Sequence, residues 1–127
     1  RRAPLWLVCF PEGTRLSAEK LALSQAYGAR AGLKRTSRVL LPKTKGFAAS
    51  VFGLKEQVRA VYDLTIQYPG EVAPTLVELI RGDIDQVDVH VRRFPVETLP
   101  VGDKLLGDWL MARLYDKDAL LGSRVPT

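Results

Sequence analysis

Cysteine and histidine each occur once in this chain of 127 residues, and asparagine is absent. A single cysteine, Cys9, excludes a disulfide within the chain. With only one histidine, His90, a structural Cys/His zinc site is short of ligands. Without asparagine there is no acceptor for N-linked glycosylation. We therefore expect no disulfide framework and no metal site, and this cysteine usage favours a cytosol-facing position.

Long apolar runs are also missing. The longest is residues 5–10, far below the ~18 residues that indicate a membrane span. The chain starts at Arg1 without a methionine or a signal-peptide pattern, so we expect it to be a piece of a longer protein. Its composition, 46% hydrophobic and 26% charged, is typical of one globular domain that needs no staple to hold a core.

Charge is unevenly distributed. Lysine and arginine exceed aspartate and glutamate by 19 to 14, and the stretch from Arg30 to Lys45 holds six basic residues and no acidic one. Arg15 lies just upstream. Such a cluster suits phosphate or acidic lipid headgroups, and a merely solvated basic face is the alternative. No nucleic-acid-binding motif accompanies it, so we expect no nucleic acid partner.

The first half of the chain reads as strand, loop and helix, twice. Residues 5–10 predict a strand buried on both faces, and residues 38–41 predict a second one. Each is closed by proline. Ser17 is placed to cap the first helix and Gly32 to end it. We expect the first helix to turn Leu23, Ala26 and Tyr27 inward, and the second helix to carry Phe47, Val51 and Leu54.

The second half continues the alternation. Residues 60–66 predict a third strand, and Pro74 is placed to start a short helix. From residue 87 to 92 valines alternate with polar residues, which predicts a strand with one wet face near a sheet edge. From Asp103 an apolar stripe predicts a closing helix with Leu106, Trp109 and Leu110 toward the core. The fold class is therefore α/β, with an open mixed sheet and flanking helices.

The string Phe-Pro-Glu-Gly-Thr-Arg at residues 10–15 follows the first expected strand, and ligands of open α/β sheets bind at such loops. Gly13 permits close backbone approach. Thr14 and Arg15 can donate to phosphate oxygens, arginine through two hydrogen bonds at once. The alternative is an ordinary turn with Glu12 and Arg15 as a surface ion pair.

This string resembles the third conserved block of the glycerolipid acyltransferases, the lysophosphatidic acid acyltransferase family. Residues 39–47, Val-Leu-Leu-Pro-Lys-Thr-Lys-Gly-Phe, are similar to the fourth block in its long eukaryotic branch. Residues 60–65 and 89–95 resemble later strands of that branch. The likeness extends from Leu5 to about Leu121 and implies that residues 1–127 are the C-terminal part of one acyltransferase domain.

The resemblance implies transfer of a fatty acyl group from acyl-CoA to lysophosphatidic acid, giving phosphatidic acid. It assigns the acceptor phosphate to four residues, among which Arg15 grips the phosphate and Glu12 orients Arg15 or the acceptor. These four are Glu12, Gly13, Thr14 and Arg15. It assigns the second wall of the pocket to Pro42, Lys43 and Lys45. Acyl-CoA enters as a co-substrate, and no bound cofactor is implied.

The family's general base, a histidine with an aspartate five residues later, is absent. Five residues after His90 comes Pro95, so we expect His90 to be structural or exposed. The catalytic block of the family precedes the third block and would lie upstream of Arg1. That histidine would take the proton of the acceptor hydroxyl, which attacks the thioester. Cys9, in an apolar strand, is expected to be an inert thiol.

Several readings remain open at this stage. The segment from Asp88 to Pro100 also resembles acyltransferases for lysophosphatidylinositol or lysocardiolipin. A non-catalytic module that binds anionic lipid or CoA, and a scaffold domain with a solvated basic face, are alternatives of other classes. The resemblance further implies phospholipid biosynthesis at the endoplasmic reticulum membrane, through membrane segments outside this chain.

Overall fold

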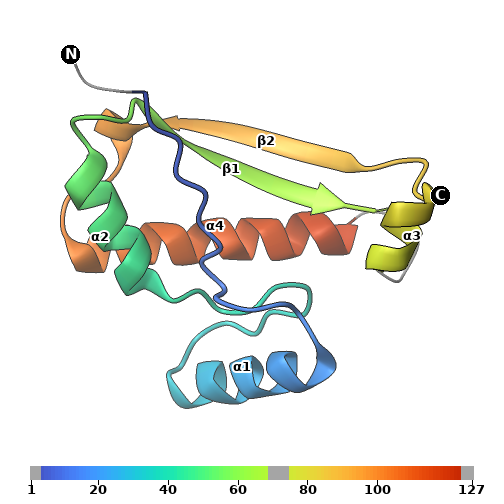
Figure 1. Ribbon diagram of the computed structural model, residues 1–127. Helices are drawn as coiled ribbons and strands as arrows, with labels where there is room; N and C mark the ends of the chain where they lie inside the picture. The colour runs from blue at the N-terminus through green and yellow to red at the C-terminus, as the bar shows by residue number, and fades with distance from the viewer. Residues whose placement is uncertain (1–3, 69–74, 124–127) are drawn as a thin grey trace.

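The computed structural model describes residues 4–68 and 75–123 (Figure 1). The elements follow one another as helices, strands and one short 3-10 turn. They are α1 (Ala18–Arg30), α2 (Thr44–Leu54), β1 (Ala60–Gln67), α3 (Leu76–Arg81), β2 (Asp88–Pro95), η1 (Val96–Thr98) and α4 (Asp103–Ser123). The expected α/β class with an open sheet is confirmed.

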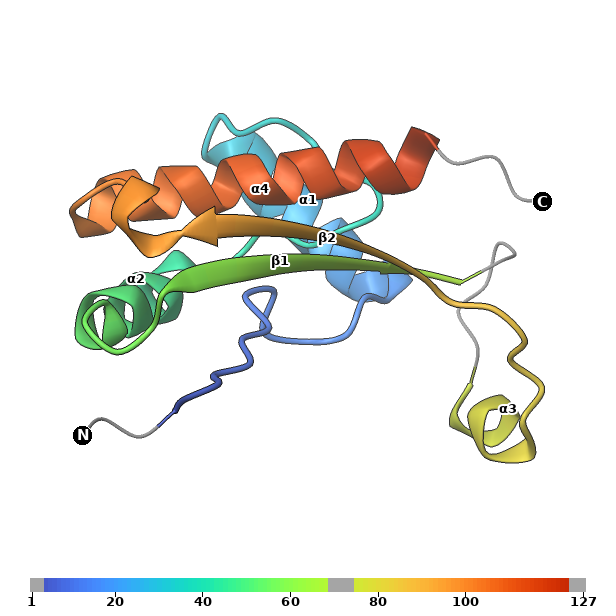
Figure 2. The same ribbon diagram turned by 90° about the horizontal axis from the view of Figure 1, so that it is seen from above.

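The described sheet consists of β1 and β2, which pair antiparallel from Ala60 opposite Pro95 to Gln67 opposite Asp88. Helix α4 runs along one side of this sheet, while residues 4–11 and helix α3 lie on the other side (Figure 2). Both strands fall where the sequence predicts them, because residues rich in valine and isoleucine favour a pleated backbone.

The core lies where α4 meets α2 and the start of the sheet. Its buried members are Val39, Phe47, Ala48, Leu99, Leu106, Leu110 and Leu114. The ring of Trp109 stacks on Phe47 at 5.7 Å between centroids and meets Phe94 edge-on at 5.1 Å. Such aromatic pairs stabilise a core beyond the area they bury. The apolar stripe predicted for the closing helix therefore faces the core, as expected.

Polar side chains fill the space between the sheet and the second half of α4. Arg92 of β2 forms ion pairs with Asp63 of β1 at 3.1 Å and with Asp116 of α4 at 3.3 Å. Lys117 reaches Asp63 at 3.0 Å and also donates to the Leu64 carbonyl oxygen. The sheet thus turns its charged face toward a helix.

The opposite face of the sheet is apolar, and its side chains are about half exposed in the described part of the chain. Val89 and Val91 of β2 are 49% and 53% exposed, and their partners Ile66 and Leu64 on β1 are equally open. The period-two pattern is confirmed, but the expectation that its polar side is the wet one is wrong. The reason is that ion pairs with α4 hold the charged side of the sheet toward this helix. The alternation of valine and polar residues does not indicate which of the two faces is covered.

Side chains cap the N-termini of α1 and α3, and the cap of α1 is the predicted Ser17. The Ser17 side chain accepts a hydrogen bond from the Lys20 backbone N–H and begins α1. Helix α3 begins at a capping box in which Thr75 and Glu78 each bind the other's backbone N–H. Pro74, expected to start this helix, lies outside the described residues.

The inward face expected for α1 is wrong. Leu23, Ala26 and Tyr27 are exposed, and the buried residue of this helix is Gly28. A Cβ built at Gly28 would lie 3.0 Å from the Leu41 side chain. The helix therefore approaches the rest of the chain through a glycine, and its large apolar side chains point elsewhere.

Two predicted strands do not form among the described residues. Residues 5–10 pair with no described strand, and Trp6 and Phe10 are 93% and 81% exposed. Residues 38–41 form no strand either, although Val39 and Leu40 are buried. A strand exists only when a neighbour satisfies its backbone groups. Here the backbone of residues 38–41 is satisfied by side chains, and residues 5–10 have no neighbouring strand.

Candidate functional site

The two strings singled out in the sequence lie against each other. A tight turn closes residues 10–13, where the Gly13 N–H donates to the Phe10 carbonyl oxygen at 3.0 Å. The Lys43 N–H donates to the Pro11 carbonyl oxygen at 2.7 Å. This hydrogen bond joins positions 32 residues apart and brings Glu12, Gly13 and Lys43 into one site.

Glu12 points toward the second string. Its carboxylate oxygen Oε2 accepts a hydrogen bond from the Leu40 backbone N–H at 2.8 Å. Leu40 is only 4% exposed, so this buried donor depends on Glu12 for a partner. Glu12 makes no ion pair with Arg15, so the alternative of an ordinary turn with a surface Glu12–Arg15 pair is not supported. The carboxylate fixes the loop to the second wall.

Gly13 is required for its conformation and its size. Its φ of +77° lies in the left-handed region, which side chains disfavour. A Cβ at this position would lie 3.3 Å from Cδ of Lys43. The aliphatic part of Lys43 therefore lies directly on the loop, and the ammonium group comes within reach of the same surface.

The cationic groups of the site are open to solvent. Thr14 and Arg15 are exposed, and Arg15 forms no hydrogen bond or ion pair with any residue in the described part of the chain. Lys43 and Lys45 are exposed as well, and Pro42 between the two walls is half-buried. Arg15, next to the turn, and Lys43, which lies on Gly13, therefore both present positive charge to solvent.

The N-terminus of α2 adds to this positive surface. Lys43 is the N-cap residue, and no side chain caps the helix. No acidic residue lies in the first turn either. The first backbone N–H groups of a helix have no partner within the helix and carry partial positive charge. An anion near Lys43 can therefore bind backbone donors and side-chain cations together.

The other candidate residues lie outside this site. Cys9 is exposed, so the expectation of a thiol buried in a strand is wrong. His90 is exposed on β2, in agreement with the expectation, and lines a shallow depression beside Thr65 and Asp116. Neither residue has a neighbour that would make it a catalytic group, since Cys9 has no adjacent base and His90 no hydrogen-bonded carboxylate among the described residues.

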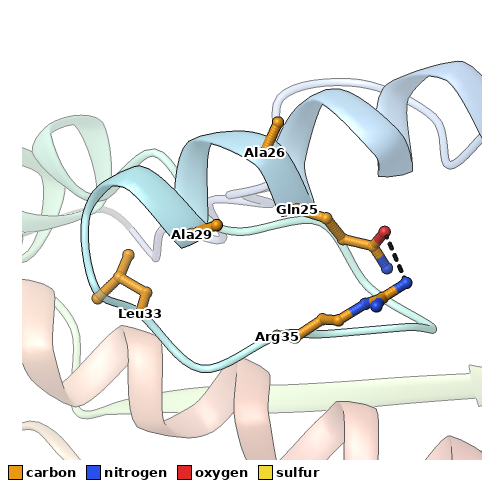
Figure 3. A pocket seen from close by; sticks show the side chains of 5 residues that line it. All are labelled: Gln25, Ala26, Ala29, Leu33 and Arg35. Carbon is orange, nitrogen blue, oxygen red and sulfur yellow. Dashed lines mark hydrogen bonds between the residues drawn. The ribbon is translucent and has the colours of Figure 1, made fainter.

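A surface pocket is formed by α1 and the loop that follows it (Figure 3). Its lining consists of Gln25, Ala26, Ala29, Leu33 and Arg35. Gln25 and Arg35 close one end with a hydrogen bond of 3.2 Å. The pocket contains none of the residues predicted to bind the acceptor, and its lining is mostly small apolar side chains. The turn of residues 10–15 therefore remains the candidate site.

The sequence reading missed four side chains that hold the second wall: Ser24, Gln25, Thr36 and Asp118. Ser24 accepts from the Leu41 N–H at 2.9 Å, and Gln25 donates to the Thr36 carbonyl oxygen at 2.8 Å. No local pattern marks Ser24, Gln25 and Asp118, because each binds backbone that is distant in the sequence. The Thr36 hydroxyl binds the Val39 carbonyl oxygen within the same segment.

Comparison with known proteins identifies the family of this chain. The family model described as "Acyltransferase C-terminus" matches residues 78–123. The chain is 36% identical over 123 residues to 1-acyl-sn-glycerol-3-phosphate acyltransferase 2 of Arabidopsis thaliana. It is 38% identical over 116 residues to the human 1-acyl-sn-glycerol-3-phosphate acyltransferase gamma. It is 39% identical over 108 residues to the human 1-acyl-sn-glycerol-3-phosphate acyltransferase delta. The chain belongs to the glycerolipid acyltransferase family.

This membership covers nearly the whole chain but a minor part of each relative. The three matches extend over 96%, 91% and 85% of this chain and over 32%, 31% and 29% of the relatives. The chain thus spans about a third of the length of the curated acyltransferases it matches. No solved structure matches the chain significantly. Within the described residues, none of the helices has the length and apolar character needed to cross a bilayer.

Proposed function

We propose that this acyltransferase chain binds the phosphate of lysophosphatidic acid, the acceptor of a 1-acyl-sn-glycerol-3-phosphate acyltransferase. The observation that supports the proposal is the exposed guanidinium of Arg15, which pairs with none of the residues that the structure describes, beside the turn on which Lys43 lies. A phosphate monoester offers several oxygens to one planar guanidinium, which can bind two of them. Lys43, Lys45 and the open N-terminus of α2 add positive charge.

The remaining site residues would set the positions of the groups that bind the phosphate. Glu12 holds the turn against Leu40 and Gly13 lets Lys43 approach, so both set the position of Arg15. Thr14 adds a hydroxyl donor next to Arg15, and Pro42 limits the backbone of the second wall. The acceptor phosphate would then fix the lipid with its free hydroxyl directed toward the acyl donor.

The reaction follows from the chemistry of the two substrates. The free hydroxyl oxygen of the acceptor attacks the thioester carbonyl carbon of acyl-CoA, and the carbon–sulfur bond breaks. Coenzyme A leaves as a thiolate, and a general base takes the hydroxyl proton. This chain contributes the acceptor site, and the base is expected outside it. Because acceptor and product are lipids, we place the reaction at a membrane, the endoplasmic reticulum membrane in the cell.

Titration of this chain with sn-glycerol 3-phosphate, followed by NMR at the Gly13, Thr14 and Arg15 amides, tests the acceptor site. We expect Arg15→Ala to weaken binding about ten- to a hundredfold, since a charge-assisted bond contributes roughly 1.5–3 kcal/mol. Arg15→Lys keeps the charge without the planar fork and should also lose much of the affinity. Lys43→Ala and Lys45→Ala should each cost on the order of 0–1 kcal/mol, and less at high salt.

Arg81→Ala on α3 is the matched control, because it removes an exposed arginine outside the site. It should leave the titration unchanged. Equal binding by the wild type, Arg15→Lys and Arg15→Ala would refute the assignment, and Glu12 and Arg15 would then belong to a structural turn. A general loss with both Arg15→Ala and Arg81→Ala would instead indicate a non-specific basic surface.

A further inference from the structure

Residues 36–43, which we name the clamped segment, have no regular secondary structure, yet side chains from other elements bind their backbone. Gln25 and Ser24 of α1 bind its Thr36 carbonyl oxygen and its Leu41 N–H. Glu12 binds its Leu40 N–H. A segment held at several backbone groups behaves as a fixed wall, because its part-buried groups at Thr36, Leu40 and Leu41 each depend on a side-chain partner.

Asp118 of α4 holds the start of this segment. Its Oδ1 atom accepts hydrogen bonds from the Ser37 N–H at 2.9 Å and from the Arg38 N–H at 2.5 Å. A carboxylate that binds two neighbouring backbone donors fixes the direction of the peptide between them. The two ends of this contact are about 80 residues apart, so α4 and the clamped segment are joined only in the folded chain.

The contact leads directly to the acceptor site. Within the clamped segment, the buried Thr36 hydroxyl donates to the Val39 carbonyl oxygen at 2.7 Å, and Val39 belongs to the core that α4 completes. The next residue, Leu40, donates to Glu12. Lys43 at the end of the segment binds Pro11 and lies on Gly13. A shift at Ser37 and Arg38 would therefore move both partners of the turn that carries Arg15.

We propose that Asp118 is a positioning residue of the acceptor site, which acts through the clamped segment on Glu12, Lys43 and hence on the turn of residues 10–15. The proposal rests on the proposed acceptor function and adds to it a residue that touches neither the acceptor nor the turn. Nothing in the order of residues around Asp118 indicates this role, which depends on where the last turns of α4 lie.

Three variants of this chain test the role. Asp118→Asn keeps an oxygen that can accept both backbone N–H groups, and Asp118→Leu has a similar shape without an acceptor. Asp108→Leu is the matched control, since Asp108 is an exposed acid on the same helix with no hydrogen bond or ion pair to the clamped segment. Two quantities are measured: amide hydrogen exchange at Ser37, Arg38 and Leu40, and the affinity for sn-glycerol 3-phosphate, with inorganic phosphate as the comparison ligand.

We expect Asp118→Leu to speed exchange at the three amides and to weaken sn-glycerol 3-phosphate about tenfold, as the loss of hydrogen bonds to a charged group does. Asp118→Asn should restore most of both quantities, and Asp108→Leu should change neither. Faster exchange in Asp118→Leu with unchanged affinity would overturn the positioning role, and so would unchanged exchange. A parallel loss in Asp108→Leu would also overturn it.

The experiment separates this proposal from the proposed function. If the wild-type chain binds neither sn-glycerol 3-phosphate nor inorganic phosphate, the acceptor function fails and the positioning role fails with it, while exchange still reports whether Asp118 holds the segment. If Asp118→Leu does not fold, Asp118→Asn decides. A folded Asp118→Asn with unprotected Ser37 and Arg38 amides, or with weakened ligand binding despite protected amides, would refute the role.

Discussion

Glu12 offers the sharpest test of the geometry, because its carboxylate has one identified partner. Replacement by alanine removes the acceptor of the Leu40 N–H. Leu40 is 4% exposed, so water has little access to replace the lost bond. A buried donor left without a partner costs about 1–3 kcal/mol. We expect Glu12→Ala to lower the free energy of unfolding by this amount.

The companion variants separate charge from hydrogen bonding. Glu12→Gln keeps a side-chain oxygen for the Leu40 N–H and loses only the charge, so it should cost about 1 kcal/mol, the difference between a hydrogen bond to a charged acceptor and one to a neutral acceptor. Glu19→Ala removes an exposed acid from the first turn of α1 and is the control, with an expected cost of about 0.3–1 kcal/mol from the helix dipole.

The assay is urea unfolding followed by tryptophan fluorescence and circular dichroism, together with hydrogen exchange at the Leu40 amide. At a slope of about 1–3 kcal/mol per M of urea, the expected loss in Glu12→Ala lowers the midpoint by roughly 1 M. Faster exchange at Leu40 should accompany it. A midpoint for Glu12→Ala equal to that of Glu19→Ala, with the Leu40 amide still protected, would refute the reasoning.

Three further outcomes follow from the structure and sequence. Gly13→Ala should lower the free energy of unfolding by about 1–2 kcal/mol, because φ is +77° and the new Cβ meets Lys43. The control Gly46→Ala, in open space within α2, should be neutral or slightly stabilising, and equal effects of the two substitutions would contradict the argument. This chain alone should transfer no acyl group from acyl-CoA to lysophosphatidic acid, since a positioned base typically supplies 10²–10⁴ of rate; product detected by mass spectrometry above the uncatalysed level would disprove this. The apolar sheet face and residues 5–10 should make the chain self-associate as its concentration rises, and Ile66→Lys should reduce this in sedimentation velocity; a wild type that stays monomeric at high concentration would count against it.

Local signals carried much of the fold. The helix periodicity of residues 44–54 and 103–123, the Ser17 cap and the valine-rich strands all appear as expected. These features depend on residues a few positions apart, so the sequence states them directly. The strings at residues 10–15 and 39–47 are also local motifs, and their resemblance to two blocks of the family indicates the family from the sequence alone.

Contacts between distant segments were decided only by the tertiary structure. The ion pairs of Arg92 with Asp63 and Asp116 turn the charged face of the sheet inward, against the pattern's usual meaning. The hydrogen bonds of Glu12 to Leu40 and of Asp118 to Ser37 join residues 28 and 81 positions apart. Residues 5–10 form no strand, because a strand depends on a neighbour and not on its own composition. Periodicity states which faces an element has, but which face is covered depends on the surface that packs against it.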